Sequence, residues 1–269
     1  MDASFQDLRF EVVEPTIARI TLARPRQLNA YTTRMCEELV RALDRYLRDD
    51  ALRVLILTGE GRGFCSGGDI SGADEAHAAL MQTQLSHARE MRDGMHAVIR
   101  VLTRLDKPVI AMIGGPAVAG GLTLALACDF RIAAESARLG DTSGRVGLLP
   151  DEGGAWLFPR AMGLDRALKM TLLSEVYDAQ TAQALGLVTE VVADAALTAH
   201  TMAFARALAA KAPLAVRLAK AMMVRGLDAT LDQSLSDASL AVMVANPTAD
   251  VHEGVAAFRE KRTPKFEGR

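Results

Sequence analysis

Apolar and polar residues alternate with two different periods along this chain, and these periods predict its first elements. Residues 16–22 alternate with the period of two expected of a strand, and Pro25 ends that strand. Residues 33–47 carry apolar side chains at helical spacing, with acidic residues early and arginines late, as the helix dipole favours. The aliphatic runs at 53–58 and 109–113 predict two further strands.

The middle of the chain continues with helices and strands in alternation. Residues 73–105 predict one long helix, because an apolar stripe recurs in steps of four, three, four and three at Met91, Met95, Val98, Leu102 and Leu105. After it we expect a short helix over 122–127, a strand over 129–133, a helix from near 153 and another over 164–173. Repeated strand and helix units of this kind predict an α/β fold with parallel strands.

The composition changes after residue 192. Residues 195–244 are dominated by Ala, Leu and Met at helical spacing and contain one proline, Pro213. This segment therefore predicts several helices and no sheet. Apolar helix faces of this extent on a short terminal segment need a partner to cover them.

Composition and charge exclude several classes of function. The chain is 50% hydrophobic and 24% charged over 269 residues, which suits a globular enzyme with a large core. A formal charge of −2 argues against a nucleic-acid partner. No apolar run reaches membrane-spanning length and the N-terminus lacks a secretory pattern, so we expect no membrane association and a cytoplasmic location. Three cysteines and five histidines without ligand spacing predict neither disulfides nor a metal site.

Two glycine-rich turns are the candidate chemistry of the chain. They read EGRGFCSGGDI at residues 60–70 and GGPAVAGGLT at residues 114–123, each after an aliphatic run. Glycine also serves tight turns and close packing, so the pairs alone are ambiguous. Where two glycine turns expose backbone N–H groups toward one oxygen, however, they form an oxyanion hole that stabilises an enolate or a tetrahedral intermediate.

Three longer stretches resolve this ambiguity through a resemblance. They are GRGFCSGGDI, DKPVIAMIGGPAVAGGLTLALACDFRIAAESARLG and VGLLPDEGGAWLFPR. Together they resemble the crotonase, or enoyl-CoA hydratase/isomerase, family, and the resemblance runs from about Ile17 to the C-terminus. It implies a spiral of ββα units over residues 1–194, a helical region over 195–269 that packs into a homotrimer or a dimer of trimers, and an acyl-CoA thioester as substrate with no other cofactor.

The resemblance also assigns roles to the two glycine turns. The N–H groups of Gly68 and Gly120 become the oxyanion donors. The first turn becomes the segment that wraps the adenine and pantetheine of coenzyme A, through Ser66, Gly67, Asp69 and Ile70. We expect Asp69 to stabilise the turn as an Asx residue, with no part in catalysis. We expect Cys65, next to the apolar Phe64, to be a small buried side chain, with no nucleophilic role.

The chain departs from the hydratase pattern at both catalytic glutamates. Typical hydratases carry one glutamate three residues after the second oxyanion glycine and one seven residues before the proline of the following turn. Thr123 and Ser143 stand at these places. Neither hydroxyl can act as the base near neutral pH, so standard hydratase chemistry is unexpected. Both are candidate pocket residues, or core hydroxyls bonded to their own helix.

A different carboxylate, Asp151, directly follows Pro150. Dienoyl-CoA isomerases, ring-epoxide phenylacetyl-CoA isomerases and dihydroxynaphthoyl-CoA synthases place their catalytic aspartate there, and the stretch is most similar to the phenylacetyl-CoA group. An aspartate before a helix is also a preferred N-cap. We predict that Asp151 shuttles a proton in an isomerase reaction. Glu152 and Asp141 are weaker candidates for the base, because we expect both to be solvated loop charges.

Basic residues are needed for the phosphates of coenzyme A. Arg24 and Arg26 precede the first helix in a place similar to the adenine-side loop of the family. The tail supplies Lys261, Arg262 and Lys265, and in relatives this motif reaches the ligand of a neighbouring subunit. Basic residues in such places are more often solvated surface charges than ligand contacts. Two alternatives to an isomerase remain, a lyase of the hydratase type and a non-catalytic binder of acyl-CoA or protein.

Overall fold

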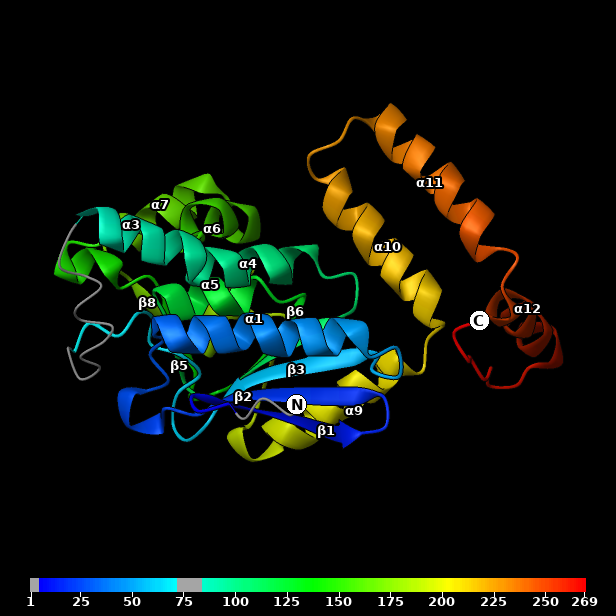
Figure 1. The fold of residues 1–269 in the computed structure, drawn as a ribbon, viewed down its shortest axis with the longest axis horizontal. Coiled ribbons are helices and arrows are strands. Elements are labelled where there is room, and N and C mark those ends of the chain that lie inside the picture. The colour runs from blue at the N-terminus through cyan, green and yellow to red at the C-terminus, as the bar shows by residue number, and fades with distance from the viewer. Residues whose placement is uncertain (1–4, 72–83) are drawn as a thin grey trace.

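The computed structural model describes residues 5–71 and 84–269 and is built on a six-stranded sheet (Figure 1). The strand order is β1-β2-β3-β4-β6-β9. β1 pairs antiparallel with β2, and the remaining neighbours pair parallel. The strands are β1 (Leu8–Glu14), β2 (Ile17–Leu22), β3 (Val54–Gly59), β4 (Val109–Ile113), β6 (Phe130–Ala134) and β9 (Glu190–Val192).

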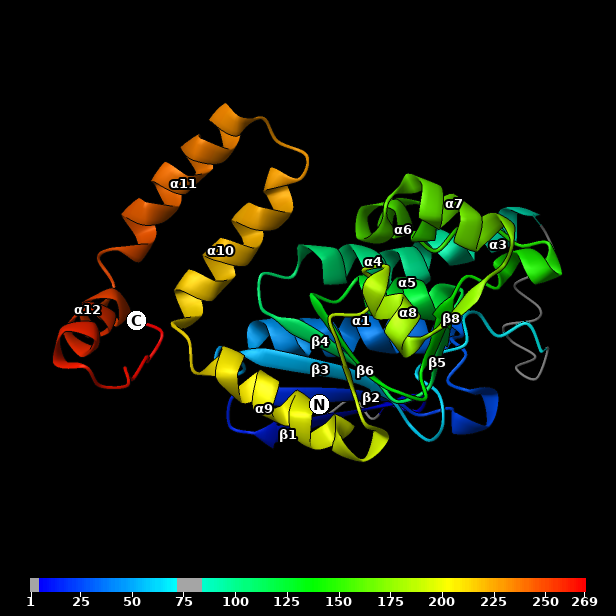
Figure 2. The same cartoon turned by 180° about the vertical axis from the view of Figure 1, so that it is seen from behind.

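Both faces of this sheet are buried, which explains the aliphatic runs of its central strands. On one face lie α1 (Thr33–Arg48) and α4 (Met95–Arg104), whose apolar stripes join the main core. On the other face lies α9 (Leu197–Ala209) (Figures 1 and 2). Its Leu197 and Ala205 belong to a second core cluster with Ile56 and Ile110. Thr32 caps α1 by accepting a hydrogen bond from the amide of Met35.

The fold contains a second sheet of three short strands. It has the order β5-β7-β8, with β5 and β7 parallel and β7 and β8 antiparallel. Its strands, β5 (Pro116–Val118), β7 (Arg138–Gly140) and β8 (Val176–Asp178), have three residues each, too few to show a period in the sequence. Around it lie α5 (Gly120–Leu126), α6 (Gly154–Met162), α7 (Leu164–Leu172), α8 (Ala179–Ala184) and the 3-10 turn η2 (Ser143–Val146).

The single helix expected over residues 73–105 is wrong in one respect. Residues 73–83 lie outside the described residues, and the rest forms two helices, α3 (Gln84–Asp93) and α4, with a break at Gly94. The backbone of Gly94 leaves the helical region, with φ −91° and ψ −105°. The apolar spacing continues across the break, which is why periodicity alone did not reveal it.

The C-terminal helices project away from the sheet (Figures 1 and 2). They are α10 (Pro213–Gly226), α11 (Leu231–Ala245) and α12 (Ala249–Glu260). Neither α10 nor α11 has a buried residue in this chain. α9 packs on the sheet, so the projecting segment begins at Pro213. No helix in the described parts of the chain has the length and apolarity to cross a membrane.

Candidate active site

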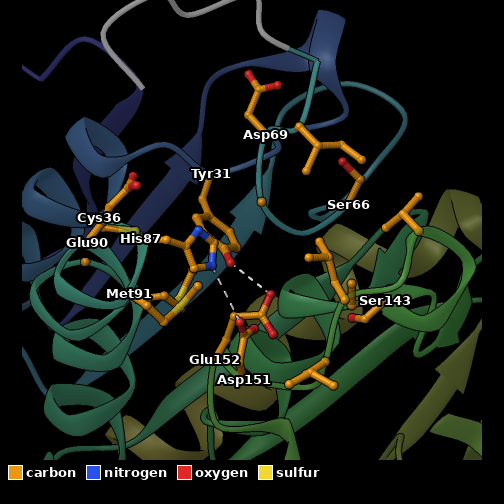
Figure 3. Close-up of a pocket in the computed structure, with 18 of the residues that line it drawn as sticks. Tyr31, Cys36, Ser66, Asp69, His87, Glu90, Met91, Ser143, Asp151 and Glu152 are labelled. Carbon is orange, nitrogen blue, oxygen red and sulfur yellow. Dashed lines mark hydrogen bonds and ion pairs between the residues drawn. The ribbon is translucent and has the colours of Figure 1, made fainter. Parts of the chain in front are cut away.

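A cavity of about 340 Å³ opens between the first glycine turn, α3, α4 and the turn before α6 (Figure 3). Its wall combines residues that are far apart in the sequence, among them Tyr31, Gly68, Ser143, Asp151 and Glu152. Apolar side chains such as Met91, Met95 and Leu149 make up much of the remainder. A mostly apolar cavity with a few convergent polar groups is typical of a small-molecule site.

The two glycine turns meet beside this cavity. Gly68 and Ala119 line it, and Gly120 follows as the first residue of α5. A Cβ added to Gly67 would lie 3.4 Å from the nitrogen of Gly120. A helix leaves the N–H groups of its first turn without intrahelical partners. Among the described residues, no hydrogen bond engages the amide of Gly68 or of Gly120.

The backbone around Gly68 is held by Tyr31. The amide of Tyr31 donates to the carbonyl of Gly67 at 2.9 Å, and the amide of Asp69 donates to the carbonyl of Tyr31 at 2.9 Å. These two bonds flank Gly68 and form a short parallel bridge. The position of its amide is therefore fixed by its neighbours, as an oxyanion donor requires.

Asp151 lies in the turn before α6 and faces the cavity (Figure 3). Its side chain is 34% exposed, and Oδ2 lies 3.9 Å from Nε2 of His87. Nε2 of His96 donates to its main-chain carbonyl at 2.7 Å, which anchors the turn. The residue at the N-cap of α6 is Gly153, and no side chain caps this helix. The alternative role of Asp151 as a helix cap is therefore wrong.

Glu152 is where the sequence reasoning fails most clearly. We expected a solvated loop charge, yet the residue is 5% exposed and lines the cavity. The hydroxyl of Tyr31 donates to Oε1 at 2.8 Å (Figure 3), while Oε2 is buried without a hydrogen-bond partner among the described residues. Burial raises the pKa of Glu152 to about 7, and the charge of Asp151 acts in the same direction.

Asp141 was also expected to be a solvated loop charge, and this prediction is wrong as well. It is fully buried, and its Oδ1 accepts a hydrogen bond from the amide of Ser143 at 3.0 Å. It does not line the cavity, so it is a structural residue that positions η2. Ser143 does line the cavity. Thr123 does not, and its buried hydroxyl has no hydrogen bond to its own helix or to other described groups.

The first turn holds Asp69 as a turn residue. Oδ1 accepts from the amide of Ser71 at 3.0 Å, the geometry of an Asx turn, and Oδ2 accepts from Arg24 at 2.7 Å. Burial raises the pKa of Asp69, but the hydrogen bonds from Ser71 and Arg24 outweigh it and lower the pKa overall. Burial raises the pKa of Cys65 to about 12, which leaves its thiol inert.

The remaining expected binding residues are divided between the two ends of the molecule. Ser66 and Ile70 line the cavity, whereas Gly67 and Arg26 are not among its lining residues. Lys261 ends α12 at the opposite end of the chain (Figure 1). Its contact with a neighbouring subunit's ligand stays a prediction. No cluster of metal-ligating side chains occurs within residues 5–71 and 84–269.

The comparisons with known proteins agree with this geometry. A family model described as enoyl-CoA hydratase/isomerase matches residues 13–269. The chain belongs to the enoyl-CoA hydratase/isomerase family. The crotonase-type fold expected from the sequence is confirmed by the crystal structure of an enoyl-CoA hydratase from Bacillus anthracis, which is 35% identical with a TM-score of 0.92 and covers 98% of this chain and 100% of its own.

Two curated relatives of similar identity bear the names of different reactions. The 1,2-epoxyphenylacetyl-CoA isomerase of Escherichia coli (strain K12) is 36% identical over 258 residues, 96% of this chain and 97% of the relative. A probable enoyl-CoA hydratase of Rhodobacter capsulatus is 38% identical over 266 residues, 99% of this chain and all of the relative. The enoyl-CoA hydratase/isomerase family acts on CoA thioesters, and the two relatives bear names of different reactions at similar identity.

Proposed function

We propose that this enzyme isomerises unsaturated or ring-bearing acyl-CoA thioesters through an enolate, with Asp151 as the base. The observation that carries the proposal is the carboxylate of Asp151, which faces the cavity that Gly68 also lines. Thr123 and Ser143 stand where hydratases of this family carry their glutamates. Removing a proton and returning it elsewhere needs no activated water, so the missing glutamates do not hinder this reaction.

The chemistry follows from the positions of the groups. A thioester oxygen between the amides of Gly68 and Gly120 accepts their hydrogen bonds, which lowers the pKa of the adjacent C–H bond. Asp151 removes a proton from carbon, and the electron pair of that bond moves through the new C=C bond onto the thioester oxygen. Protonation at another carbon returns the electrons and leaves a shifted double bond.

Hydration is the second candidate, and Glu152 favours it. Stereospecific addition of water is served by two carboxyl groups that position and activate the molecule, and this cavity contains Asp151 and Glu152 side by side. The pair differs in position from the glutamates of standard hydratases. The Rhodobacter relative is named a probable enoyl-CoA hydratase, which also favours a test of hydration.

For the substrate we assign coenzyme A to the first glycine turn and the acyl group to the apolar cavity. Ser66 and Ile70 line the cavity from the same loop. Arg24 is already paired with Asp69, so of these two arginines we assign Arg26 to a phosphate. Lys261 of a second copy would add a positive charge from outside.

We also assign a homotrimer or a dimer of trimers. α10, α11 and the turn between them expose large apolar side chains that a single chain leaves in water: Met223, Leu227, Leu231, Leu235, Leu240 and Met243. Such a patch is typical of a protein interface. Sedimentation velocity at micromolar concentration checks the assignment, and a monomer at that concentration would contradict it.

A product analysis by mass tests the reaction class. The protein is incubated separately with a 3-enoyl-CoA and with crotonyl-CoA, a 2-enoyl-CoA. We expect an isobaric product with a shifted double bond from the first. A product heavier by one water from crotonyl-CoA would favour hydration, and CoA binding without turnover of either compound would contradict an enzymatic role.

A further inference from the structure

The buried pair of Tyr31 and Glu152 is not used by the reaction as described above. Tyr31 and Glu152 come from distant parts of the chain and meet at the inner wall of the cavity (Figure 3). Glu152 has one oxygen bonded to the Tyr31 hydroxyl and one buried oxygen without a partner among the described residues. A buried carboxyl with an unsatisfied oxygen is costly in its charged form.

The pair lies against the second oxyanion residue. A Cβ on Gly120 would overlap Oε1 of Glu152 and lie 2.7 Å from Cε1 of Tyr31. The ring of Tyr31 also lies against Gly68, where an added Cβ would be 3.3 Å from its hydroxyl. The carboxyl of Glu152 is thus next to the place where the thioester oxygen and its neighbouring carbons must lie.

The groups around Glu152 do not explain why a carboxyl group is buried at this position. The titratable groups that face it are Asp151 on the same turn, Asp141, Tyr31 and the thiols of Cys36 and Cys65. None of these groups is a cation; His87, whose Nε2 lies 3.9 Å from Oδ2 of Asp151, and Glu90 line the same cavity. Burial raises the pKa of both thiols and of Tyr31 well above neutrality, so these three groups do not donate protons near neutral pH.

We propose that Glu152 is a second catalytic residue, a neutral acid that delivers the proton to the carbon where the new C–H bond forms. Asp151, as a carboxylate, removes the proton from the other carbon. The single-carboxylate shuttle expected from the sequence thereby becomes a relay of two carboxyl groups. This inference rests on the proposed isomerase function and on Asp151 as its base.

The step balances in protons and electrons. Asp151 gains one proton and Glu152 loses one, while the electron pair of the broken C–H bond returns from the enolate to form the new C–H bond. Transfer of a proton from Asp151 to Glu152, directly or through solvent, resets the site. Two neighbouring carboxyls with unlike surroundings, one half-exposed and one buried, suit a division into base and acid.

Tyr31 is a positioning residue in this relay. Its hydroxyl donates to Oε1, which fixes the carboxyl at the wall of the cavity and lowers the pKa of Glu152 against the effect of burial. Removing that hydroxyl raises the pKa of the acid. We therefore expect Tyr31→Phe to move the alkaline limb of kcat/KM to higher pH, an effect that a merely structural tyrosine would not produce.

The test is the conversion of a 3-enoyl-CoA in D₂O by the intact enzyme, under single turnover, with deuterium in the product read by mass spectrometry. The acid proton of Glu152 exchanges with solvent, so the wild-type product should carry solvent deuterium. Glu152→Gln keeps the shape and can still hydrogen-bond but cannot give a proton. We expect it to slow conversion about 10²-fold, to reduce deuterium in the product and to lose the alkaline limb near pH 7.

Glu38→Gln is the matched control. Glu38 is also a buried glutamate, but both of its oxygens accept backbone amides, from Gln6 and Asp7 at 2.8 Å, and it lies outside the cavity. We expect this variant to behave as the wild type does. Equal deuterium content and rate in the wild type and Glu152→Gln would overturn the relay, as would the same loss in Glu38→Gln.

A measurement without substrate separates this inference from the proposed function. Difference infrared spectra of wild type and Glu152→Gln at pH 6 should show a protonated carboxyl band in the wild type alone. Absence of that band overturns the acid role of Glu152 whatever the reaction. If the band is present but Asp151→Asn keeps full activity, the proposed base is wrong and the relay falls with it.

Discussion

The two turns that face each other across the cavity differ in how their carboxylates are hydrogen-bonded. In the first, residues 60–71, both oxygens of Asp69 are bonded, to Ser71 and to Arg24. In the second, residues 147–154, Asp151 faces the cavity and Glu152 keeps one oxygen without a partner among the described residues. A satisfied carboxylate fixes a backbone, whereas an unsatisfied one in a cavity retains capacity for proton transfer.

Tyr31 connects these two turns. Its backbone bonds to Gly67 and Asp69 in the first, and its hydroxyl bonds to Glu152 in the second. We therefore expect substitutions in the first turn to change mainly the stability of the protein, and substitutions in the second turn to change mainly its rate of catalysis.

The largest effect is expected at Asp151. Asp151→Asn removes the base while its position on the turn, anchored through the main chain by His96, is unchanged. We expect kcat for isomerisation to fall roughly 10²–10⁴-fold with KM altered little. Steady-state kinetics on the 3-enoyl-CoA measure this, and a near wild-type kcat would remove Asp151 from the mechanism.

The next largest effect is expected at the second oxyanion residue. In Gly120→Ala the new Cβ overlaps Oε1 of Glu152, so the helix start or the carboxyl must move. Displacing one oxyanion donor costs about 10²–10³-fold in kcat. Kinetics together with a circular-dichroism melt distinguish lost catalysis from lost folding, and unchanged kinetics would show that this amide is not a donor.

Asp69→Asn should lower stability while leaving catalysis nearly unchanged, the reverse of what we expect for Asp151→Asn. The loss of the buried bond to Arg24 should lower the free energy of unfolding by about 1–3 kcal/mol, with kcat within a few-fold of wild type. Because the pKa of Asp69 is lowered in the folded state, its stabilising effect exists above the unfolded pKa and is lost as the pH falls through the folded value. Denaturation at pH 7 and in acid measures it, and a kcat loss as large as that of Asp151→Asn would contradict the comparison.

The last effect is a gain in stability from Glu152→Gln, similar in size to the loss in Asp69→Asn and opposite in sign. The raised pKa of Glu152, about 7 against 4.5 unfolded, means that the folded wild type loses stability as the pH rises between these values. The neutral glutamine avoids this loss. We expect the variant to be more stable than wild type by about 1–3 kcal/mol at pH 8, with the difference vanishing near pH 4. Urea unfolding at both pH values checks this, and a variant less stable at pH 8 would contradict burial as the cause.

The sequence predicted most of the fold because long elements with one buried face repeat their pattern. α1 lies where its periodicity places it, and β4, buried throughout, lies where its aliphatic run places it. The three-residue strands of the small sheet have no period to read, and β1, largely exposed, carries a mixed pattern. The break at Gly94 interrupts the backbone without interrupting the apolar stripe.

The site was predicted only as far as local motifs reach. Gly68, Gly120 and Asp151 stand in short recognisable stretches, and the structure brings them together. Glu152 was misjudged because its environment is set by Tyr31, 121 positions away, and charge in a loop motif gives no sign of burial. Asp141 was misjudged for the same reason, since its burial depends on how η2 packs.

The central claim is that two main-chain amides hold one thioester oxygen while Asp151 faces the carbon that loses its proton. A crystal structure of the enzyme with a slowly reacting acyl-CoA tests it directly. We predict the thioester oxygen at about 2.7–3.1 Å from the nitrogens of both Gly68 and Gly120, with an acidic C–H directed at the carboxylate of Asp151. An oxygen out of reach of either amide, or an acyl group that lies away from Asp151, would contradict the account.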